Sequence, residues 1–312
     1  NNYFSLNIKK AKDLRYGENP HQNASIYYTN NTVDYEVLNG KELSYNNILD
    51  VSACTNILSE FYDVCACVII KHNTPCGAAL GKDISEAWAK ALDCDPLSAF
   101  GGIVGFTQVV NEDLAKQLTA MFLEVVIAPD FTLKALELLK TKKNLRVIKL
   151  NTSLIEYKNH LNQEIRVTPF GTLIQDSDKG EQDKDNFKVV TKAKPTAEMV
   201  EDMIFAWKIV KHAKSNAIVI AKDFKAIGIG QGQTSRVDAF EIALNKACDG
   251  SKDAVAASDG FFPAIDNIHV AAQGRIAAII QPGGSIKDED VIKTADKYNI
   301  AMITTGIRHF KH

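Results

Sequence analysis

The chain has 312 residues, of which 46% are hydrophobic and 24% charged, and its formal net charge at pH 7 is -2. These values are typical of a globular protein with one large core or two domains of about 150 residues, and they do not indicate nucleic acid or membrane as a partner. No apolar run approaches the roughly 20 residues of a transmembrane helix, and residues 1–14 lack the apolar centre of a secretory signal. We therefore expect a cytoplasmic protein with reduced cysteines. Because the chain begins with Asn1 and not with methionine, we also expect a fragment or a processed form.

The first polar motif is "LRYGENPHQ" at residues 14–22. It sets Arg15, Tyr16 and His21 around a glycine and a proline, in a loop that could hold a phosphate through the rigid fork of the arginine. A turn with solvated charges would show the same pattern, so both interpretations stay open.

The segment "VIIKHNTPCGAA" (68–79) joins an apolar run to polar residues. Residues 65–71 predict a buried strand that ends at Lys71 and His72. Ligands of α/β proteins bind at the carboxyl ends of strands, and a histidine there can exchange a proton near neutral pH. The alternative is that both residues are only polar groups at the end of a strand.

The same segment partly matches the zinc deaminase signature, H-x-E followed by P-C-x-x-C. His72 is followed by Asn73 and Thr74, so the glutamate is missing. Pro75 and Cys76 are present, but the second cysteine position holds Ala79. We therefore do not expect a catalytic zinc site of this type.

Helical patterns alternate with apolar runs along the next part of the chain. Asp83 and Asn111 are candidate N-caps, and Glu86 completes a capping-box pattern with Asp83. Leu114, Leu118 and Met121 form the apolar stripe of the second helix, and residues 124–129 predict a strand. This alternation predicts an α/β protein with buried, largely parallel strands.

Residues 175–195 are highly charged and poor in large apolar side chains, which predicts a linker. It would separate a first unit, residues 1–174, from a second unit, residues 196–312. The helix after the linker carries an apolar stripe that we expect in the core, formed by Met199, Met203, Ala206 and Val210.

The two units resemble each other in sequence. Residues 125–150 align with 278–304, each reading as strand, proline turn, hydroxyl N-cap (Thr132 or Ser285), helix and strand. The strand that ends at Lys71 aligns with one that ends at Lys222. These matches predict a duplicated α/β unit.

Two later motifs each allow two interpretations. "GIGQGQTSR" (228–236) is glycine-rich but matches no phosphate-binding signature, which favours a hairpin or bulge followed by a helix cap at Thr234 or Ser235. "SDGFFPAIDN" (258–267) combines two aspartates with two phenylalanines, which suits the stacking of a flat heterocycle and the binding of its amino groups. A core phenylalanine pair is the alternative.

Eight motifs occur here in one order: "LRYGENPHQ", "LNGKELSYNNILD", "KHNTPCGAA", "DPLSAFGGIV", "KSNAIVIAKD", "GIGQGQTSR", "SDGFFPAIDN" and "GIRHFKH". Over essentially its whole length the chain resembles the AICAR transformylase portion of the bifunctional purine biosynthesis family. The resemblance implies an α/β fold of two duplicated cytidine-deaminase-like units with mixed, mostly parallel sheets. It also implies formyl transfer from 10-formyltetrahydrofolate to the 5-amino group of aminoimidazole carboxamide ribotide (AICAR), giving formyl-AICAR and tetrahydrofolate in purine (IMP) biosynthesis.

The resemblance assigns roles to residues of this chain. His72 would remove the proton of the attacking amino group, and Lys71 and Asn216 would stabilise the oxyanion and help to protonate the leaving nitrogen of the folate. An aspartate of some members is replaced here by Glu124, which keeps the carboxylate but changes its reach. The implied substrate-binding residues are Arg15, Tyr16, Ser98, Phe100, Gly101, Glu124, Arg236, Phe261, Asp266 and Arg308.

The resemblance also concerns partners. It implies a homodimer with active sites at the interface, folate as cosubstrate, no catalytic metal and, in some members, a structural monovalent cation such as K⁺ near the position of Asp259. The cyclohydrolase domain that is normally fused to this portion is absent from these residues, so we do not expect ring closure. The alternatives are a catalytically silent nucleotide-binding fragment and a zinc nucleoside deaminase.

Overall fold

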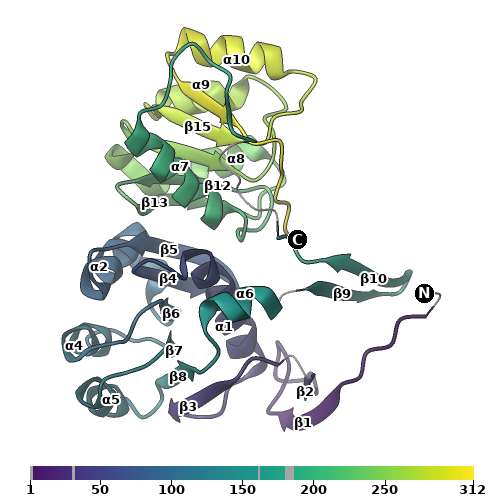
Figure 1. The fold of residues 1–312 in the computed structure, drawn as a ribbon, viewed down its shortest axis with the longest axis vertical. Coiled ribbons are helices and arrows are strands. Elements are labelled where there is room, and N and C mark those ends of the chain that lie inside the picture. Colours follow the sequence, from purple (N-terminus) through teal and green to yellow (C-terminus); the bar gives the residue numbers. More distant parts are fainter. Residues whose placement is uncertain (1–2, 30–31, 161, 180–185) are drawn as a thin grey trace.

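The computed structural model describes residues 3–29, 32–160, 162–179 and 186–312. One mixed sheet of 12 strands runs through the molecule, in the order β11-β16-β15-β14-β12-β13-β5-β4-β6-β7-β8-β3 (Figure 1). Its strands are β3 (Tyr35–Asn39), β4 (Ala66–Lys71), β5 (Thr74–Leu80), β6 (Ile103–Phe106), β7 (Val125–Ala128), β8 (Arg146–Leu150), β11 (Lys188–Val189), β12 (Ile218–Lys222), β13 (Lys225–Gly230), β14 (Val255–Ser258), β15 (Ala278–Gln281) and β16 (Ala301–Thr304).

Helices cover both faces of this sheet. They are α1 (Tyr45–Leu58), α2 (Ile84–Cys94), α3 (Pro96–Ala99), α4 (Glu112–Thr119), α5 (Leu133–Lys140), α6 (Leu154–His160), α7 (Ala197–Val210), α8 (Arg236–Ala247), α9 (Asp266–Gln273) and α10 (Asp288–Lys297), with 3₁₀ turns η1 (Ser59–Phe61) and η3 (Cys248–Ser251). Consecutive residues of β4 alternate between two cores: Val68 packs with α1 and α7, whereas Cys67 packs with α2 and α4. The strand is apolar throughout because each of its faces is covered. No helix in the described ranges is long and apolar enough to cross a membrane.

Two hairpins lie outside the large sheet. The first is β1 (Lys9–Leu14) with β2 (Ala24–Tyr28), and the second is β9 (Gln163–Thr168) with β10 (Gly171–Asp176). Figure 1 shows that β9 and β10 extend away from the body of the molecule. The second hairpin exposes Val167, Phe170 and Leu173, whose accessible fractions are 80%, 103% and 61%. A protruding arm with this much exposed apolar surface is typical of a contact with another chain.

The two halves of the sheet have the same topology. The first α/β unit, α1 to β8, orders its strands β5-β4-β6-β7-β8, and the second α/β unit, α7 to β16, orders them β13-β12-β14-β15-β16. In each unit a helix precedes an antiparallel hairpin, and two parallel pairs follow. The hairpins meet in the middle, where Lys225 of β13 pairs with Ala79 of β5.

The expectation of mostly parallel sheets is wrong. Within the described residues, four strand pairs of the large sheet are parallel. Seven pairs are antiparallel. An apolar strand shows that both faces are buried, but it does not show direction, because helices cover antiparallel hairpins here as well.

Most predicted helix starts are observed. Asp83 accepts a hydrogen bond from Glu86 N at 2.9 Å, and Asn111 accepts one from Leu114 N, also at 2.9 Å. Thr132 caps α5, but the predicted N-cap Ser285 is wrong because α10 begins only at Asp288. Ser285 instead accepts from Lys287 N at 3.1 Å in a turn before the helix.

The stripe predicted on α7 is confirmed as core. Met203, Ala206 and Val210 are completely buried, and Met199 packs against the same core. Of the predicted linker, residues 180–185 lie outside the described residues. Before them the chain completes β10, and after them Lys188–Val189 pairs with β16 as an edge strand.

Residues 228–230 of the glycine-rich motif end strand β13, the second strand of the hairpin with β12, and residues 231–235 lead to α8. This agrees with the hairpin interpretation. A side chain on Gly230 would place its Cβ 1.8 Å from Ala239 O of α8, and one on Gly77 of β5 would place it 2.2 Å from Ala91 O of α2. Both glycines are therefore required where a helix lies directly on the strand. The adjoining helix begins after Ser235, although no hydrogen bond from that side chain caps it.

Candidate active site

The turn between β4 and β5 carries Lys71 and His72. His72 and Asn73 have φ of 51° and 62°, so the chain reverses within two residues of left-handed backbone. Thr74 Oγ1 donates to Lys71 O at 2.8 Å and closes the turn. The His72 side chain is exposed and Lys71 is half-buried. The strand end therefore presents an imidazole to solvent beside a partly covered ammonium group.

The Lys71 ammonium binds the backbone of the "DPLSAFGG" motif. Its Nζ donates to Phe100 O at 2.8 Å and to Gly101 O at 3.0 Å. Gly101 has φ of 67°, and a Cβ there would lie 3.1 Å from Lys71 Nζ and 3.2 Å from the Phe122 ring. The structure thus brings together Lys71, Phe100 and Gly101, three of the residues predicted from sequence.

Ser98 lies on the short helix α3, which ends directly before Phe100, and its side chain binds Asp95 at the start of that helix. Its Oγ donates to Asp95 Oδ2 at 2.7 Å, and its backbone N donates to Asp95 Oδ1 at 3.0 Å. Lys246 of α8 also binds Asp95. Partial burial acts to raise the pKa of Asp95, but the hydrogen bonds from Lys246 and Ser98 outweigh it and lower that pKa. The ion pair with Lys246 therefore joins the Ser98 helix to the second α/β unit.

Glu124 directly precedes β7, and its side chain contacts α1. Its Oε2 accepts from Asn47 Nδ2 at 3.0 Å, and its backbone N donates to Gly102 O at 2.9 Å. Asp50, one turn further along α1, accepts from Asn73 N at 2.6 Å. These contacts place two carboxylates on the same side of the turn as Lys71 and His72.

A pocket of about 270 Å³ opens beside this turn. Lys71 and His72 line it from the first α/β unit, and Gln231 and Lys246 line it from the second. Gln231 Nε2 donates to Pro75 O at 2.8 Å, whereas its Oε1 is buried without a partner among the described residues. The polar end of β4 therefore faces a cavity that both units enclose.

A second cluster surrounds Asn216, which precedes β12. Asn216 Oδ1 accepts from Arg236 Nη2 at 2.7 Å, and its Nδ2 donates to Gln233 O at 3.0 Å and Thr234 O at 3.1 Å. Arg236 is buried and also forms an ion pair with Asp259, which has no exposed surface. The side chain of Asn216 is thus fixed from both ends.

The C-terminal segment packs on this second cluster. His309 N donates to Asp259 O at 2.9 Å, and the Arg308 guanidinium lies 4.5 Å from the centre of the Phe310 ring. A Cβ on Gly260 would lie 2.6 Å from Phe310 Cε1. These contacts place Arg308, which is exposed, next to the Asn216 and Arg236 group.

The two phenylalanines of "SDGFFPAIDN" have different environments. Phe262 is completely buried against Phe240, at a ring distance of 6.3 Å, whereas Phe261 is half-buried. Asp266 is exposed at the first turn of α9, where its Oδ1 accepts from Asn267 N at 2.8 Å. Phe262 is therefore a core residue, as the alternative interpretation of this motif predicts. Phe261 and Asp266 stay accessible.

Arg15 and Tyr16 form a third group, at the end of β1. Arg15 is exposed, and its guanidinium lies 5.5 Å from the centre of the Tyr16 ring. In the described part of the chain, no hydrogen bond or ion pair joins Arg15 to the Lys71 group or to the Asn216 group. Within one chain Arg15 and Tyr16 therefore form a group of their own, whereas Gln231 and Gln233 link the other two groups by hydrogen bonds.

Cys76 does not resemble a metal ligand. Its Sγ donates to Ile69 O at 3.6 Å, and burial raises the pKa of the thiol to about 12. A thiol must lose its proton to bind zinc, so this environment disfavours a ligand role. Within the described residues no group of three or more His, Cys, Asp and Glu side chains is arranged to hold a metal.

Sequence reasoning missed Asn47, Asp50, Asp95 and Lys246. Asn47 and Asp50 are three residues apart, so they share a face of α1, but the same spacing occurs on any solvated helix face. Asp95, directly before Pro96, has the sequence pattern of an ordinary helix N-cap, so nothing in the sequence marks it as a site residue. Lys246 lies 151 residues from Asp95, and only the fold brings them together.

Comparison with known proteins identifies the family. Residues 1–246 match the sequence model of the family described as AICARFT/IMPCHase bienzyme. The chain belongs to this family. The resemblance found in the eight motifs is thereby confirmed.

Relatives of this family match almost the whole chain. The bifunctional purine biosynthesis protein PurH of Brachyspira hyodysenteriae is 51% identical over 321 residues, covering 100% of this chain and 60% of the relative. The PurH proteins of Caldicellulosiruptor saccharolyticus and Aquifex aeolicus are 49% and 48% identical, each covering 99% of this chain and 61% of the relative. The chain therefore spans about three-fifths of the length of these relatives. A solved structure, Acinetobacter baumannii RibD (form 2), matches 34% of each chain with 14% identity and a TM-score of 0.26, from which we conclude nothing.

Proposed function

We propose that this chain transfers the formyl group of 10-formyltetrahydrofolate to the 5-amino group of AICAR, giving formyl-AICAR and tetrahydrofolate. The family and the PurH relatives support a role in purine biosynthesis. The observation that carries the proposal is the turn at the end of β4, where the Lys71 ammonium is anchored and the His72 imidazole is free to meet a ligand.

The proposed reaction is a direct substitution at the formyl carbon. A bond forms between this carbon and the 5-amino nitrogen of AICAR, and the bond from the carbon to N10 of the folate breaks. The amino group loses a proton, which His72 would take, and N10 gains one on leaving, so nothing is oxidised or reduced. The carbonyl oxygen becomes negative in between, and Lys71 and Asn216 are the donors that we assign to it.

The substrate residues would come from all three groups. Arg15, Tyr16 and Arg308 would hold the nucleotide, chiefly its phosphate, because an arginine can bind phosphate with two parallel hydrogen bonds. Ser98, Phe100, Gly101 and Glu124 would surround the reacting end. Phe261 and Asp266 would border the nucleotide and folate pocket, and Arg236 would act there by holding Asn216.

A homodimer would explain why Arg15 and Tyr16, among the described residues of one chain, make no hydrogen bond or ion pair with the other two groups. The family resemblance implies active sites at a dimer interface, and the exposed side chains of β9 and β10 provide apolar surface for one. We infer that residues of one subunit complete the site of the other. In the same way we infer a fusion to a cyclohydrolase domain in the whole protein, because the relatives are bifunctional and longer.

The repeated topology supports two duplicated, deaminase-like α/β units, which we place at residues 1–174 and 196–312 with residues 175–195 between them. Both units order their strands alike and carry a lysine at the end of the first hairpin strand. We also place the protein in the cytoplasm, where its six free cysteines would stay reduced.

The Asp259 carboxylate is surrounded by hydrogen-bond donors and a positive charge, so it does not need a structural cation as a partner. Oδ1 accepts from Ala217 N at 3.1 Å and forms the ion pair with Arg236, and Oδ2 accepts from Ser215 Oγ at 2.5 Å. Arg236 already balances the charge of this carboxylate, so its burial does not depend on a cation. No step of the reaction is therefore assigned to a cation.

The test is turnover of AICAR and 10-formyltetrahydrofolate by this chain, with tetrahydrofolate formation as the readout. We expect turnover, and we expect His72→Ala to lower kcat by about 10² or more, as loss of a general base usually does. His160→Ala is the matched control, because His160 is an exposed histidine at the end of α6, which carries none of the predicted site residues. Full activity of His72→Ala would remove its assigned role. Release of ammonia from nucleosides, with zinc bound, would instead favour the deaminase alternative.

A further inference from the structure

The two α/β units contain turns with the same backbone conformation and different side chains. In the first unit His72 and Asn73 have φ of 51° and 62°, and in the second Asp223 and Phe224 have φ of 53° and 55°. A lysine ends the strand before each turn. The second turn therefore shows which contacts hold the same backbone conformation when no histidine is present.

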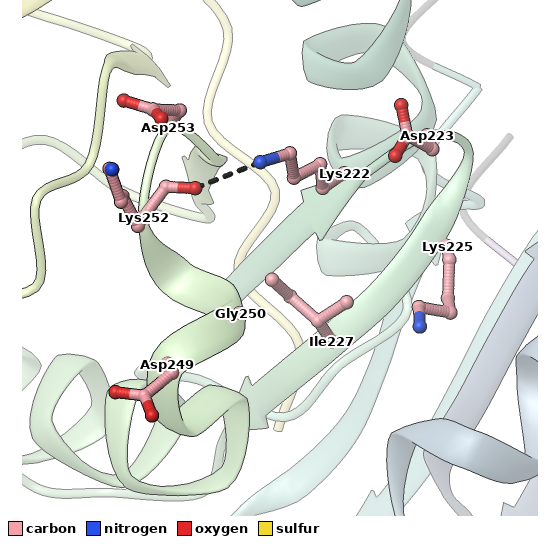
Figure 2. Close-up of a pocket in the computed structure, with 8 residues that line it drawn as sticks. All are labelled: Lys222, Asp223, Lys225, Ile227, Asp249, Gly250, Lys252 and Asp253. Atoms are coloured by element: carbon pink, nitrogen blue, oxygen red, sulfur yellow. Dashed lines mark hydrogen bonds between the residues drawn. The ribbon is translucent and has the colours of Figure 1, made fainter.

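The lysines before the two turns make the same kind of contact, although Lys71 binds two backbone carbonyls and Lys222 binds one. Lys71 Nζ donates to Phe100 O at 2.8 Å, and Lys222 Nζ donates to Lys252 O at 2.9 Å. Figure 2 shows the second contact at the edge of a pocket that Asp223 and Lys225 also line. This lysine contact is therefore a shared structural feature of both units.

A helix carboxylate binds each turn, but in a different way. Asp202 of α7 uses both oxygens: Oδ2 accepts from Asp223 N at 2.9 Å, and Oδ1 accepts from Phe224 N at 2.7 Å. Asp50 of α1 uses only Oδ1, which accepts from Asn73 N at 2.6 Å. Among the described residues no hydrogen bond or ion pair reaches Asp50 Oδ2. The first turn is therefore held by one carboxylate oxygen of Asp50. The other oxygen, Oδ2, can still accept a hydrogen bond.

Charged groups of the candidate site surround Asp50. Burial raises the pKa of its carboxyl group, with the nearby Glu124 acting in the same direction, while His72 and Lys71 act to lower it. Glu124 is itself bound to α1 through Asn47, at 3.0 Å. Asp50 therefore lies half-buried within electrostatic reach of the imidazole and the ammonium group.

We infer that Asp50 is a positioning residue of the candidate active site: one carboxylate oxygen holds the turn that carries His72, and the other keeps a negative charge close to the imidazole. The inference rests on the proposed function, in which His72 becomes positively charged as it takes the proton of the amino group. A fixed carboxylate nearby stabilises that charge more strongly in a partly buried site than in water.

The test uses matched substitutions in the two units. Asp50→Asn keeps an oxygen that can accept from Asn73 N but removes the charge, so kcat should fall about tenfold or more while KM changes less than about twofold. Asp202→Asn makes the same change at the second turn and should leave kcat within about twofold of wild type. Asp50→Glu, which keeps the charge, should retain more kcat than Asp50→Asn. The inference is overturned if Asp50→Asn keeps the wild-type kcat, or if both Asn variants lower kcat equally.

A second measurement separates this inference from the proposed function. If the wild-type chain shows no formyl transfer, the proposed function fails, and amide hydrogen exchange then tests the positioning of the turn by itself. Exchange at Asn73 N should become about tenfold faster or more in Asp50→Ala and stay unchanged at Phe224 N, with the reverse in Asp202→Ala. Unchanged protection of Asn73 N in Asp50→Ala would overturn the inference.

Discussion

Arg236 holds Asn216 in place: the guanidinium Nη2 donates to the amide Oδ1 over 2.7 Å. The other arm of the same guanidinium forms an ion pair with the completely buried Asp259. The position of an amide assigned to the reaction therefore depends on a buried charge pair.

Removal of the Arg236 charge should destabilise the chain strongly. Arg236→Met leaves Asp259 buried and unpaired, so we expect a loss of about 3–5 kcal/mol in the free energy of unfolding, measured with urea. Formyl transfer should fall as well, because Asn216 loses its donor. Lys225→Met, which breaks the largely exposed pair with Asp93, is the control and should change unfolding little. Equal effects of both substitutions would contradict this account.

Lys71 should matter for turnover beyond its structural contact. Lys71→Ala removes two hydrogen bonds from an ammonium group to backbone carbonyls, and Lys222→Ala removes one. Both should lower the unfolding midpoint in urea, Lys71→Ala the more, but only Lys71→Ala should lower kcat, by about 10² or more, through loss of oxyanion stabilisation. A similar kcat for the two variants would leave Lys71 with a structural role alone.

Gly101 should not tolerate a side chain. In Gly101→Ala the new Cβ would lie 3.1 Å from Lys71 Nζ, so the ammonium group would have to move and kcat should fall about tenfold or more. Gly284 also has positive φ, 95°, but a Cβ there meets nothing within 4 Å. Gly284→Ala should therefore cost only about 1 kcal/mol of stability and keep kcat. Comparable kcat losses in both variants would argue against the contact with Lys71.

A buried charge cluster between the two α/β units should make stability depend on pH. Glu60 of η1 accepts from Lys211 Nζ at 2.9 Å, and His212 Nε2 lies 3.2 Å from the same oxygen. Burial lowers the pKa of His212 to about 4, from 6.5. Burial opposes ionisation of Glu60, but the hydrogen bonds from His212 and Lys211 outweigh it and lower its pKa.

The sign of the effect is the same for both groups. Below about pH 6.5 the unfolded chain takes up a proton at His212 that the folded chain does not, so stability should fall by up to about 3 kcal/mol as the pH decreases toward 4. Below pH 4.5 protonation of Glu60 in the unfolded chain adds to this loss. Urea unfolding between pH 7.5 and 4.5 measures it. His212→Gln keeps a donor for Glu60 without titrating, so its midpoint should vary less between pH 6.5 and 5; an equally steep dependence would exclude His212 as the cause.

The phosphate assignment predicts a difference between ligands. Arg15→Ala and Arg308→Ala should weaken the binding of AICAR much more than that of its free nucleobase, because only the nucleotide carries the phosphate. Binding measured by calorimetry checks this, with Arg146→Ala as the control, since Arg146 donates to Glu42 O and belongs to no predicted site. Equal weakening of both ligands would remove the phosphate role.

Local features could be read from the sequence because they depend on neighbouring residues. Asp83, Asn111 and Thr132 cap helices through backbone groups three residues away, and the stripe on α7 follows from the period of a helix. Strand direction could not be read, because an apolar strand such as β4 looks the same whether its buried neighbours are parallel or antiparallel. Ser285 failed as a cap because Asp288, which starts the helix, accepts from Ser285 N instead.

In the candidate site, too, some features could be predicted from the sequence and others could not. The prediction that Lys71 and His72 belong to a site came from the sequence alone, because an apolar strand that ends in a lysine and a histidine needs no distant residue to be recognised. Only the tertiary structure showed that Asp50 holds the turn with one oxygen, and that Lys246 reaches Asp95 across the two units. Sequence determines which groups are available, whereas the distances between groups far apart in the chain are set by how helices pack on the sheet.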